Sequence, residues 1–450
     1  MDTIAAIATP LGEGGIGIIR VSGTKSIEIA NNLASVDLTK LLPRKMTLGY
    51  VVDNGKHLDQ VLWVVMPGPH SFTGEDVVEI HCHGGLKVTE LVLEAVITAG
   101  ARLAEPGEFS KRAFLNGKID LAQAEAIIDV IRAKTDTSLR VAFRILEGDL
   151  SKTIEKNRQV LLGILAAIEA SIDYPEDVEE PDRFSLKEKV QSIIGDINKL
   201  TESFARGKSL REGFLVTIVG RPNVGKSSLL NYLAKEERAI VTDIPGTTRD
   251  VVEVEINIRG VPVIIADTAG LRSTVDPVES IGVSKSREYL QKADLCLWVL
   301  DNSEALTEED KQIATLLRDK PVLILLNKQD KPAKIKIDDL DALNLYSKLL
   351  PLSLKEGTGF TDFFNELENQ VGFSGYETTE EILLTRVRHR RALERAAESL
   401  SQVEVNLYNQ PMDLLVVDIR QAYLSLGEVT GQTVKEEIID KIFQEFCLGK

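Results

Sequence analysis

The chain has 450 residues, of which 43% are hydrophobic and 27% are charged, and its formal net charge is −16. This length suits roughly two to four domains of ordinary globular composition, and no apolar run is long enough to span a membrane. The negative charge argues against a protein that coats nucleic acid with its whole surface, but it permits a local basic patch. The three cysteines are widely separated and match neither a disulfide framework nor a zinc-binding spacing, so we expect a reducing, cytoplasmic environment.

Residues 1–117 are expected to form an α+β domain. Apolar runs at residues 16–21, 61–66 and 77–81 predict buried strands, and the Gly- and Pro-rich stretches between them predict turns. The stretch that follows, residues 86–99, has helical spacing and ends before Gly100, which suits the C-terminal cap of a helix.

Residues 118–210 and 376–450 are predicted to be helical. In the first stretch, apolar residues recur at helical spacing in residues 119–131, 160–172 and 185–209. In the second stretch, a capping box of Thr433 and Glu436 predicts the start of a last helix. Neither stretch can bury its apolar faces alone. We therefore expect one all-α domain built from both stretches, with residues 211–375 inserted between them.

Residues 211–375 alternate strands and helices, which is the pattern of an α/β domain. The predicted strands are residues 215–219, 252–258, 261–267, 295–301, 322–327 and 349–354. The last four are nearly continuous apolar runs, as in a sheet that helices cover on both faces. Residues 252–258 alternate apolar and polar side chains, which predicts an edge strand with one solvated face.

A phosphate-binding motif follows the first of these strands. Residues 220–227 (GRPNVGKS) have the G-x-x-x-x-G-K-[ST] spacing, and a predicted helix comes directly after them. Gly220 and Gly225 allow the tight turn that aims successive N–H groups at phosphate oxygens, and the helix N-terminus adds a favourable field. Lys226 is then expected to reach the β- and γ-phosphates, and the Ser227 hydroxyl to bind Mg²⁺.

Two further motifs end strands of the same domain. In residues 267–270 (DTAG), Asp267 is placed to hold Mg²⁺ through water, and Gly270 lets a backbone N–H approach the γ-phosphate. In residues 327–330 (NKQD), the Asp330 carboxylate is placed to accept the N1–H and the exocyclic amine of guanine, a donor pair that adenine lacks. Each motif is weak alone. Their order favours a GTPase over an ATPase or a fold that does not hydrolyse nucleotide.

The segment around the second motif carries candidates for catalysis. The threonines of residues 246–250 (GTTRD) can bind Mg²⁺ and release it after hydrolysis, as a switch does. Leu271 stands where many regulatory GTPases have a water-orienting glutamine, so another group must orient the water. Glu279 is the candidate, and a solvated surface acid is the alternative interpretation of this residue.

These motifs together resemble the MnmE (TrmE) family of tRNA-modifying GTPases over essentially the whole chain. The nucleotide motifs place the chain only in a superfamily, whereas stretches near the two termini are specific. The specific stretches are residues 2–10 (DTIAAIATP), 14–23, 116–126 and the C-terminal CLGK of residues 447–450. The resemblance implies an N-terminal α+β folate-binding-like domain at 1–117, an all-α helical domain from 118–210 and 376–450, and an inserted α/β P-loop GTPase domain at 211–375.

For the nucleotide, the resemblance implies a homodimer whose GTPase domains meet and hydrolyse GTP with K⁺ and Mg²⁺. Thr248 would join Ser227 on Mg²⁺, and Glu279 would orient the attacking water through a second water. The K⁺ ligands would be Asn223, Thr242, Ile244 and Thr247. The expected GTP-binding residues are Asn223, Val224, Gly225, Lys226, Ser227, Ser228, Thr242, Thr247, Thr248, Asp267, Thr268, Ala269, Gly270, Asn327, Lys328, Asp330, Ser353, Leu354 and Lys355.

For the N-terminal domain, the resemblance implies a folate one-carbon donor, 5,10-methylenetetrahydrofolate, with 5-formyltetrahydrofolate as an analogue. Arg20, Glu79, Lys118 and Lys450 match the family positions for this ligand. The two first-named cations of this set, Arg20 and Lys118, suit the glutamate tail, and Glu79 suits the pterin. Cys447, near Lys450, is a further candidate site residue, and an ordinary thiol is the alternative interpretation. A plain surface charge is the alternative for each charged residue.

The implied reaction adds an aminomethyl or carboxymethylaminomethyl group at C5 of the wobble uridine of certain tRNAs, in a heterotetramer with the flavoprotein MnmG (GidA). A basic patch is either a contact for the tRNA backbone or a solvated helix face. The patch comprises Arg386, Arg388, His389, Arg390, Arg391 and Arg395. A second class of function stays open at this point, a regulatory GTPase of ribosome assembly whose outer domains bind RNA.

Overall fold

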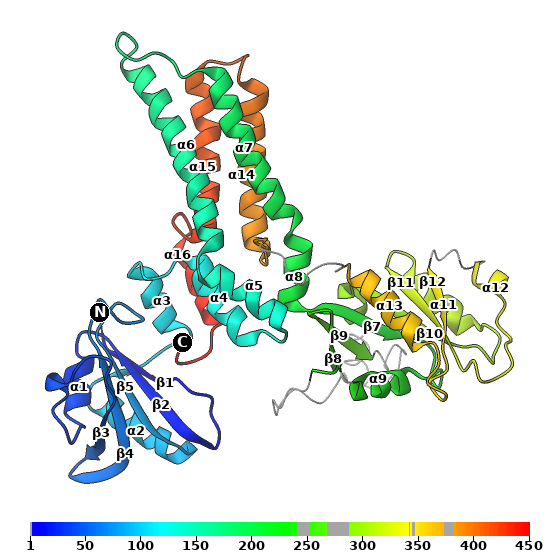
Figure 1. Cartoon of the computed structure of the whole chain (residues 1–450), viewed down its shortest axis with the longest axis horizontal. Helices are drawn as coiled ribbons and strands as arrows, with labels where there is room; N and C mark the ends of the chain where they lie inside the picture. Colours follow the sequence, from blue (N-terminus) through cyan, green and yellow to red (C-terminus); the bar gives the residue numbers. More distant parts are fainter. Residues whose placement is uncertain are drawn as a thin grey trace. The chain divides into compact units, whose positions relative to one another are not determined.

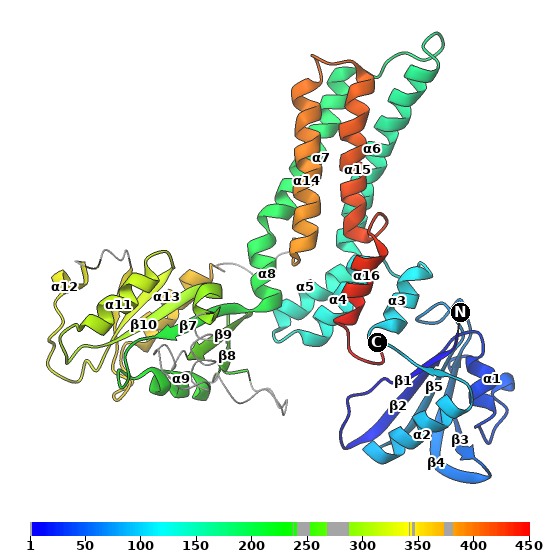
Figure 2. The ribbon, with the colours of Figure 1, turned by 180° about the vertical axis from the view of Figure 1, so that it is seen from behind.

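The computed structural model divides the chain into two units, each built from segments that are distant in sequence (Figures 1 and 2). The terminal unit consists of Met1–Ile131, Phe143–Asn198 and Arg391–Lys450, and the central unit of Arg132–Ala142 and Lys199–Arg390. The structure describes residues 2–236, 238–240, 253–267, 288–341, 343, 347–372 and 381–450. No helix within these described ranges is long and apolar enough to cross a membrane.

The N-terminal part of the terminal unit is a six-stranded sheet in the order β3-β4-β5-β2-β1-β6. Its strands are β1 (Ile4–Ile7), β2 (Gly14–Ser22), β3 (Thr47–Asp53), β4 (Lys56–Met66), β5 (Val77–Gly84) and β6 (Arg102–Leu103). Neighbouring strands are antiparallel except β1 and β6. The helices of this part are α1 (Ser26–Asn31), α2 (Leu86–Thr98) and α3 (Glu108–Leu115), with a 3-10 turn at Leu38–Lys40. The α+β architecture and the α2 helix with its glycine cap are confirmed.

The remainder of the terminal unit is helical. Helices before and after the central unit pack together, and α6 lies along α15 (Figures 1 and 2). Gln191 on α7 donates to Glu404 on α14 (2.5 Å). The bounds are α4 (Leu121–Arg132), α6 (Asp149–Asp173), α7 (Arg183–Glu202), α14 (Val387–Asn406), α15 (Met412–Thr430) and α16 (Glu436–Gln444). Most of α5 (Asp136–Leu146) belongs to the central unit. The apolar faces that neither stretch can bury alone are thus buried by the other.

Two local predictions for the helices are wrong. The capping box does not form, because the Thr433 hydroxyl donates instead to the Leu424 carbonyl oxygen (2.8 Å) and Lys435 is the N-cap of α16. The helix predicted over 185–209 is two helices, α7 and α8 (Phe204–Glu212), which meet at Ser203. The Ser203 hydroxyl donates to the Leu200 carbonyl oxygen and accepts the N–H of Leu384, so the break between the two helices falls where a side chain bonds a remote segment.

The central unit contains a six-stranded sheet in the order β12-β11-β10-β7-β9-β8, in which only the β8–β9 pair is antiparallel. Its strands are β7 (Phe214–Val219), β8 (Glu253–Ile258), β9 (Val261–Asp267), β10 (Leu295–Asp301), β11 (Val322–Asn327) and β12 (Lys348–Pro351). The alternating strand lies at the edge, as predicted. The strand predicted over 349–354 ends at Pro351, and the residues after it form a loop that reaches the nucleotide motifs.

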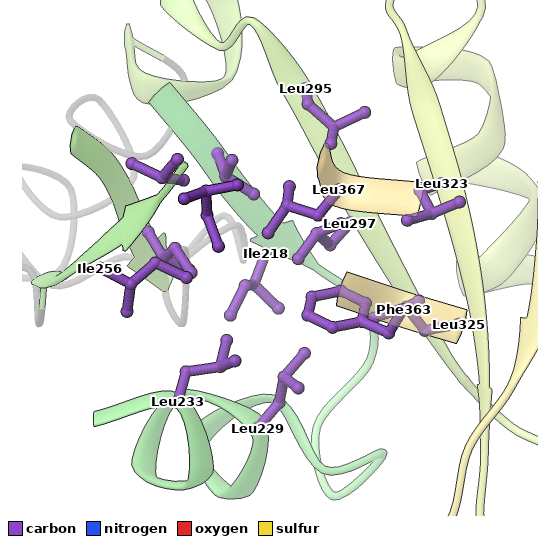
Figure 3. Packing of buried hydrophobic residues seen from close by; sticks show 14 of the residues in the cluster. Ile218, Leu229, Leu233, Ile256, Leu295, Leu297, Leu323, Leu325, Phe363 and Leu367 are labelled. Atoms are coloured by element: carbon purple, nitrogen blue, oxygen red, sulfur yellow. The ribbon is translucent and has the colours of Figure 1, made fainter. Parts of the chain in front are cut away.

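Helices cover both faces of the central sheet, as the continuous apolar strands predict. On one face, Leu229 and Leu233 of α9 (Lys226–Lys235) and Phe363 of α13 (Phe360–Val371) pack against Ile218 and Leu297 (Figure 3). On the other face, α11 (Glu308–Leu317) packs against β10 and β11. A short helix, α12 (Ile337–Asp341), follows β11. The parallel strands bring the carboxyl ends of β7, β9, β10 and β11 to one edge of the sheet.

Candidate functional site

The loop between β7 and α9 has the conformation of a phosphate cradle. Gly220 (φ 147°) and Gly225 (φ 112°) both have positive φ angles. A β-carbon at Gly220 would lie 2.4 Å from the Val299 carbonyl oxygen, and one at Gly225 would lie 2.3 Å from Asn327 Nδ2. Both positions therefore require glycine for two reasons, the backbone angle and the close approach of a neighbour.

Lys226, the first residue of α9, bends back over this loop. Its ammonium donates to the carbonyl oxygens of Gly220 (2.7 Å) and Arg221 (2.8 Å). Gly225 is the N-cap of α9, so the positive end of the helix points at the same place. The loop thus combines a lysine ammonium with a helix N-terminus, which is the field that phosphate oxygens require.

Asp267 ends β9 beside Ser227. The Ser227 hydroxyl donates to Asp267 Oδ2 (3.2 Å), whereas Asp267 Oδ1 is buried without a hydrogen-bond partner among the described residues. Burial raises the pKa of Asp267, and the Lys226 ammonium and the Ser227 hydroxyl oppose that shift. A carboxylate with an unsatisfied oxygen next to a hydroxyl is the oxygen donor set that Mg²⁺ prefers. These residues therefore fit the predicted metal.

The NKQD segment after β11 holds the phosphate loop from outside. Asn327 Nδ2 donates to the Val224 carbonyl oxygen (2.7 Å), and Lys328 Nζ donates to the Asn223 carbonyl oxygen (3.0 Å). The structure thus brings two of the predicted motifs together through two successive backbone carbonyls. Asn223 has a positive φ of 64°, which asparagine tolerates better than most residues.

The loop after β12 completes this edge of the sheet. Ser353 is fully buried, and its hydroxyl donates to Asp330 Oδ1 (2.9 Å), which fixes the orientation of the carboxylate. The Leu354 N–H donates to Asn327 Oδ1 (3.2 Å), while Lys355 is exposed. The guanine-binding residues predicted from sequence thus lie in one cluster, with Asp330 held as an acceptor.

Several predicted residues of the nucleotide site lie outside the described residues and stay predictions. They are Thr242, Ile244, Thr247, Thr248, Thr268, Ala269, Gly270 and Glu279. This group includes most of the predicted K⁺ ligands and the predicted catalytic glutamate.

A second charged cluster forms in the terminal unit. Arg20 on β2 is paired in register with Glu79 on β5, and its Nε donates to Glu79 Oε1 (2.9 Å). Arg20 Nη1 also donates to the Gly449 carbonyl oxygen (3.3 Å), so the last residues of the chain reach the N-terminal sheet. A β-carbon at Gly449 (φ 87°) would lie 2.2 Å from the Ile7 carbonyl oxygen. The C-terminal segment therefore packs directly on β1.

Lys450 is partly buried in this cluster. Burial lowers the pKa of Lys450, and the Arg20 guanidinium lowers it further, while Cys447 and Glu79 act in the opposite direction. Three of the four residues predicted for folate thus come together, although about 430 residues separate Arg20 from Lys450. Cys447 itself is exposed.

The fourth residue, Lys118, lies against a neighbouring loop. Its Nζ donates to the Pro69 carbonyl oxygen (3.0 Å). The same loop carries Phe72, whose ring centroid lies 5.9 Å from the Arg20 guanidinium carbon, and the Phe109 ring lies 5.7 Å from that carbon. Neither aromatic residue belongs to a motif of the sequence. A Gly- and Pro-rich loop with one aromatic residue was the only available signal for Phe72.

The predicted basic patch does not form one exposed face. His389 is buried, and the Arg390 guanidinium carbon lies 4.6 Å from the Phe204 ring centroid. Arg395 is paired with Glu428 (2.5 Å), and Arg391 is exposed. The α14 residues of this patch therefore point in several directions, and part of their charge is used within the fold.

Two family models match the chain: the MnmE helical domain over residues 121–447, and the GTP-binding protein TrmE N-terminus over residues 3–118. The "tRNA modification GTPase MnmE" of Alkaliphilus oremlandii (strain OhILAs) is 47% identical over 460 residues, covering 100% of this chain and 99% of that protein. The chain belongs to the MnmE family of tRNA modification GTPases. The protein of the same name from Alkaliphilus metalliredigens (strain QYMF) is 48% identical over 457 residues, again covering 100% of this chain and 99% of the relative.

Among solved structures, a variant of Aquifex aeolicus Era bound to GDP and AlF4⁻ aligns with 41% of this chain and 66% of its own, at 27% identity. The TM-score of this alignment is 0.30. The MnmE membership confirms the resemblance, the fold class and the enzyme class, a GTPase of tRNA modification that binds GTP.

Two buried acids beside the phosphate loop belong to none of the predicted motifs. Asp310 on α11 pairs with Arg221 of the phosphate loop (2.9 Å), and its side chain is fully buried. Asp301, the last residue of β10, pairs with Lys328 (2.6 Å). The signal in the sequence was slight: an acid at the end of a fully apolar strand and an acid in the first turn of the next helix.

Proposed function

We propose that this GTPase acts with the flavoprotein MnmG to add an aminomethyl or carboxymethylaminomethyl group at C5 of the wobble uridine of certain tRNAs. The one-carbon unit comes from 5,10-methylenetetrahydrofolate. The enzyme works in the cytoplasm as a homodimer and, with MnmG, as a heterotetramer. Its domains are the folate-binding domain at 1–117, the helical domain from 118–210 and 376–450, and the GTPase domain at 211–375.

The observation that carries this proposal is the cluster of Arg20, Glu79 and Lys450. Folate combines a pterin, which donates hydrogen bonds, with a glutamate tail that carries carboxylates. In this cluster, the Glu79 carboxylate can accept hydrogen bonds from the pterin, and the cations of Arg20 and Lys450 can pair with the carboxylates of the tail. The rings of Phe72 and Phe109, which lie beside Arg20, offer apolar area to a flat ligand. A simple surface ion pair would not need the chain terminus folded onto the sheet.

The nucleotide site supports the GTP-dependent part of the proposal. Ser227 and Asp267, with Thr248, would hold Mg²⁺, which supplies charge neutralisation at the phosphate oxygens when it is bound. Lys226 binds the phosphates, and Asp330 selects guanine. Asn223, Thr242, Ile244 and Thr247 are the proposed ligands of K⁺, and Glu279 is the proposed water-orienting residue. Hydrolysis then depends on K⁺ and on the meeting of two GTPase domains.

Folate binding by the full-length chain tests the proposal. We expect isothermal titration with 5-formyltetrahydrofolate to show saturable binding by the wild-type protein and its loss in Arg20→Gln. Arg102→Gln is the matched control, because Arg102 also pairs with acids of the N-terminal part but lies in an exposed network with Asp2 and Glu108. Wild-type protein that does not bind the folate, or equal affinity in Arg20→Gln, would refute the folate assignment.

A further inference from the structure

Asp301 is a buried carboxylate whose two oxygens are both held. It is 4% exposed and lies in register with Asn327 on the adjacent strand β11. Its Oδ1 accepts the N–H (2.9 Å) and the hydroxyl (2.7 Å) of Ser303, and its Oδ2 accepts Lys328 Nζ (2.6 Å). Asp301 is thus a fixed anionic anchor next to the NKQD segment.

Lys328 links Asp301 to the phosphate loop. The ammonium that pairs with Asp301 also donates to the Asn223 carbonyl oxygen (3.0 Å). Lys328 and Asn223 both have a φ of 64°, a conformation that persists only where the surroundings hold it. Burial opposes the charge of Asp301, but hydrogen bonds from Lys328 and Ser303 hold the pKa of Asp301 below its usual value. The Asp301 carboxylate is therefore ionised at neutral pH.

The direction of the Asn223 carbonyl decides where the next N–H points. A trans peptide is planar, so the C=O of Asn223 and the N–H of Val224 lie in one plane and point in opposite directions within it. Asn327 acts in the same way one residue later, because its hold on the Val224 carbonyl fixes the plane that contains the Gly225 N–H. Both carbonyls are held by the NKQD segment, and both N–H groups point away from it, as a phosphate-binding nest requires.

We propose that Asp301 is a positioning residue for nucleotide binding, which aims the Val224 N–H at the phosphate groups by holding Lys328 on the Asn223 carbonyl. The inference rests on the GTP binding of the family and is independent of folate and K⁺. The Val224 N–H would contact a phosphate group in GTP, in the transition state and in GDP. Its loss therefore weakens GDP and GTP binding alike and raises KM while kcat stays nearly constant.

The Asp301→Asn variant tests this chain of contacts. In the full-length protein, we expect GDP affinity, measured with a fluorescent GDP analogue, to fall about 10- to 100-fold. The KM for GTP rises by a similar factor, and kcat stays within about twofold. Asp362→Asn is the matched control, because Asp362 is an exposed acid at the start of α13. Unchanged GDP affinity in Asp301→Asn, or a fall in kcat at constant KM, would overturn the proposal.

A double-variant cycle separates positioning from a general structural effect. Lys328→Met should weaken GDP binding at least as much as Asp301→Asn, and adding Asp301→Asn to it should cause no further loss, because Asp301 acts through Lys328. The double variant also removes both charges, so it keeps the test valid where Asp301→Asn alone leaves the partly buried Lys328 ammonium without its partner and does not fold. Independent, multiplicative losses in the two variants would refute the proposed order of contacts.

Discussion

Replacing Gly225 by alanine should weaken nucleotide binding without disrupting the fold of the central unit. Gly225 has a φ of 112°, which an alanine adopts only at a cost of about 1–2 kcal/mol. Its new β-carbon would lie 2.3 Å from Asn327 Nδ2 and 3.0 Å from Leu354 Cδ1. The asparagine must therefore move away from the Val224 carbonyl, which it now reaches at 2.7 Å.

The loss of that hydrogen bond adds about 1–2 kcal/mol, since the carbonyl is left without its partner in a buried place. The variant loop relaxes out of the cradle conformation, and the nucleotide must restore it. The two costs sum to about 2–4 kcal/mol, so we expect GDP affinity to fall about 30- to 1,000-fold. Equilibrium titration with a fluorescent GDP analogue measures this change directly.

Gly372→Ala is the matched control for the backbone cost. Gly372 caps α13 with a φ of 72°, and a β-carbon there would meet no atom within 4 Å. This variant should lower the free energy of unfolding by about 1–2 kcal/mol and leave GDP affinity unchanged. GDP binding by Gly225→Ala within twofold of the wild type would refute the steric reasoning, as would equal losses of affinity in both variants.

Other predictions address the terminal unit and the metal dependence. Cys447 is exposed, whereas Cys82 and Cys296 are buried, and burial raises the pKa of these two thiols to about 11. A disulfide reagent at neutral pH should therefore modify only Cys447 in the native chain, and all three thiols after denaturation. Arg112→Met removes a buried guanidinium and leaves the largely buried Glu75 carboxylate without its cation (3.1 Å), so it should lower the free energy of unfolding by about 3 kcal/mol in urea titrations; an unchanged midpoint would contradict this. Burial and Arg20 lower the folded-state pKa of Lys450 below its unfolded value, so its charge destabilises the fold at neutral pH and this cost fades as pH rises through the folded pKa. Lys450→Met should thus raise the unfolding temperature at pH 7, with the gain shrinking as the pH rises. Replacing K⁺ by Na⁺ should sharply slow GTP turnover, and equal rates in both salts would exclude the K⁺ assignment.

The nucleotide-binding fold was largely readable from sequence because its signals are local. Apolar runs of strand length, the alternation in residues 252–258 and the glycines of residues 220–227 each depend on neighbours within a few positions. The confirmed edge position of β8 and the helices on both faces of the sheet follow from such patterns. The spacing of the three nucleotide motifs placed them at strand ends, and parallel strands then bring those ends to one edge.

Predictions failed where a side chain had a distant partner. Thr433 and Glu436 have the spacing of a capping box, but the hydroxyl of Thr433 donates to a carbonyl of α15 instead. Likewise, the break between α7 and α8 falls at Ser203, whose hydroxyl accepts the N–H of Leu384, 181 residues away. A hydrogen bond to a remote backbone group leaves no trace in the local periodicity, so sequence alone favours the nearer partner.

The sequence by itself determined the elements, the family resemblance and the residue types that a GTP-binding edge requires. Only the tertiary structure decided which charges meet. It placed Arg20, Glu79 and the C-terminal Lys450 together, and it paired Asp301 with Lys328 and Asp310 with Arg221. The physical reason is that a charge buried by folding needs a partner in space, and the partner comes from whichever segment the packing of strands and helices brings near.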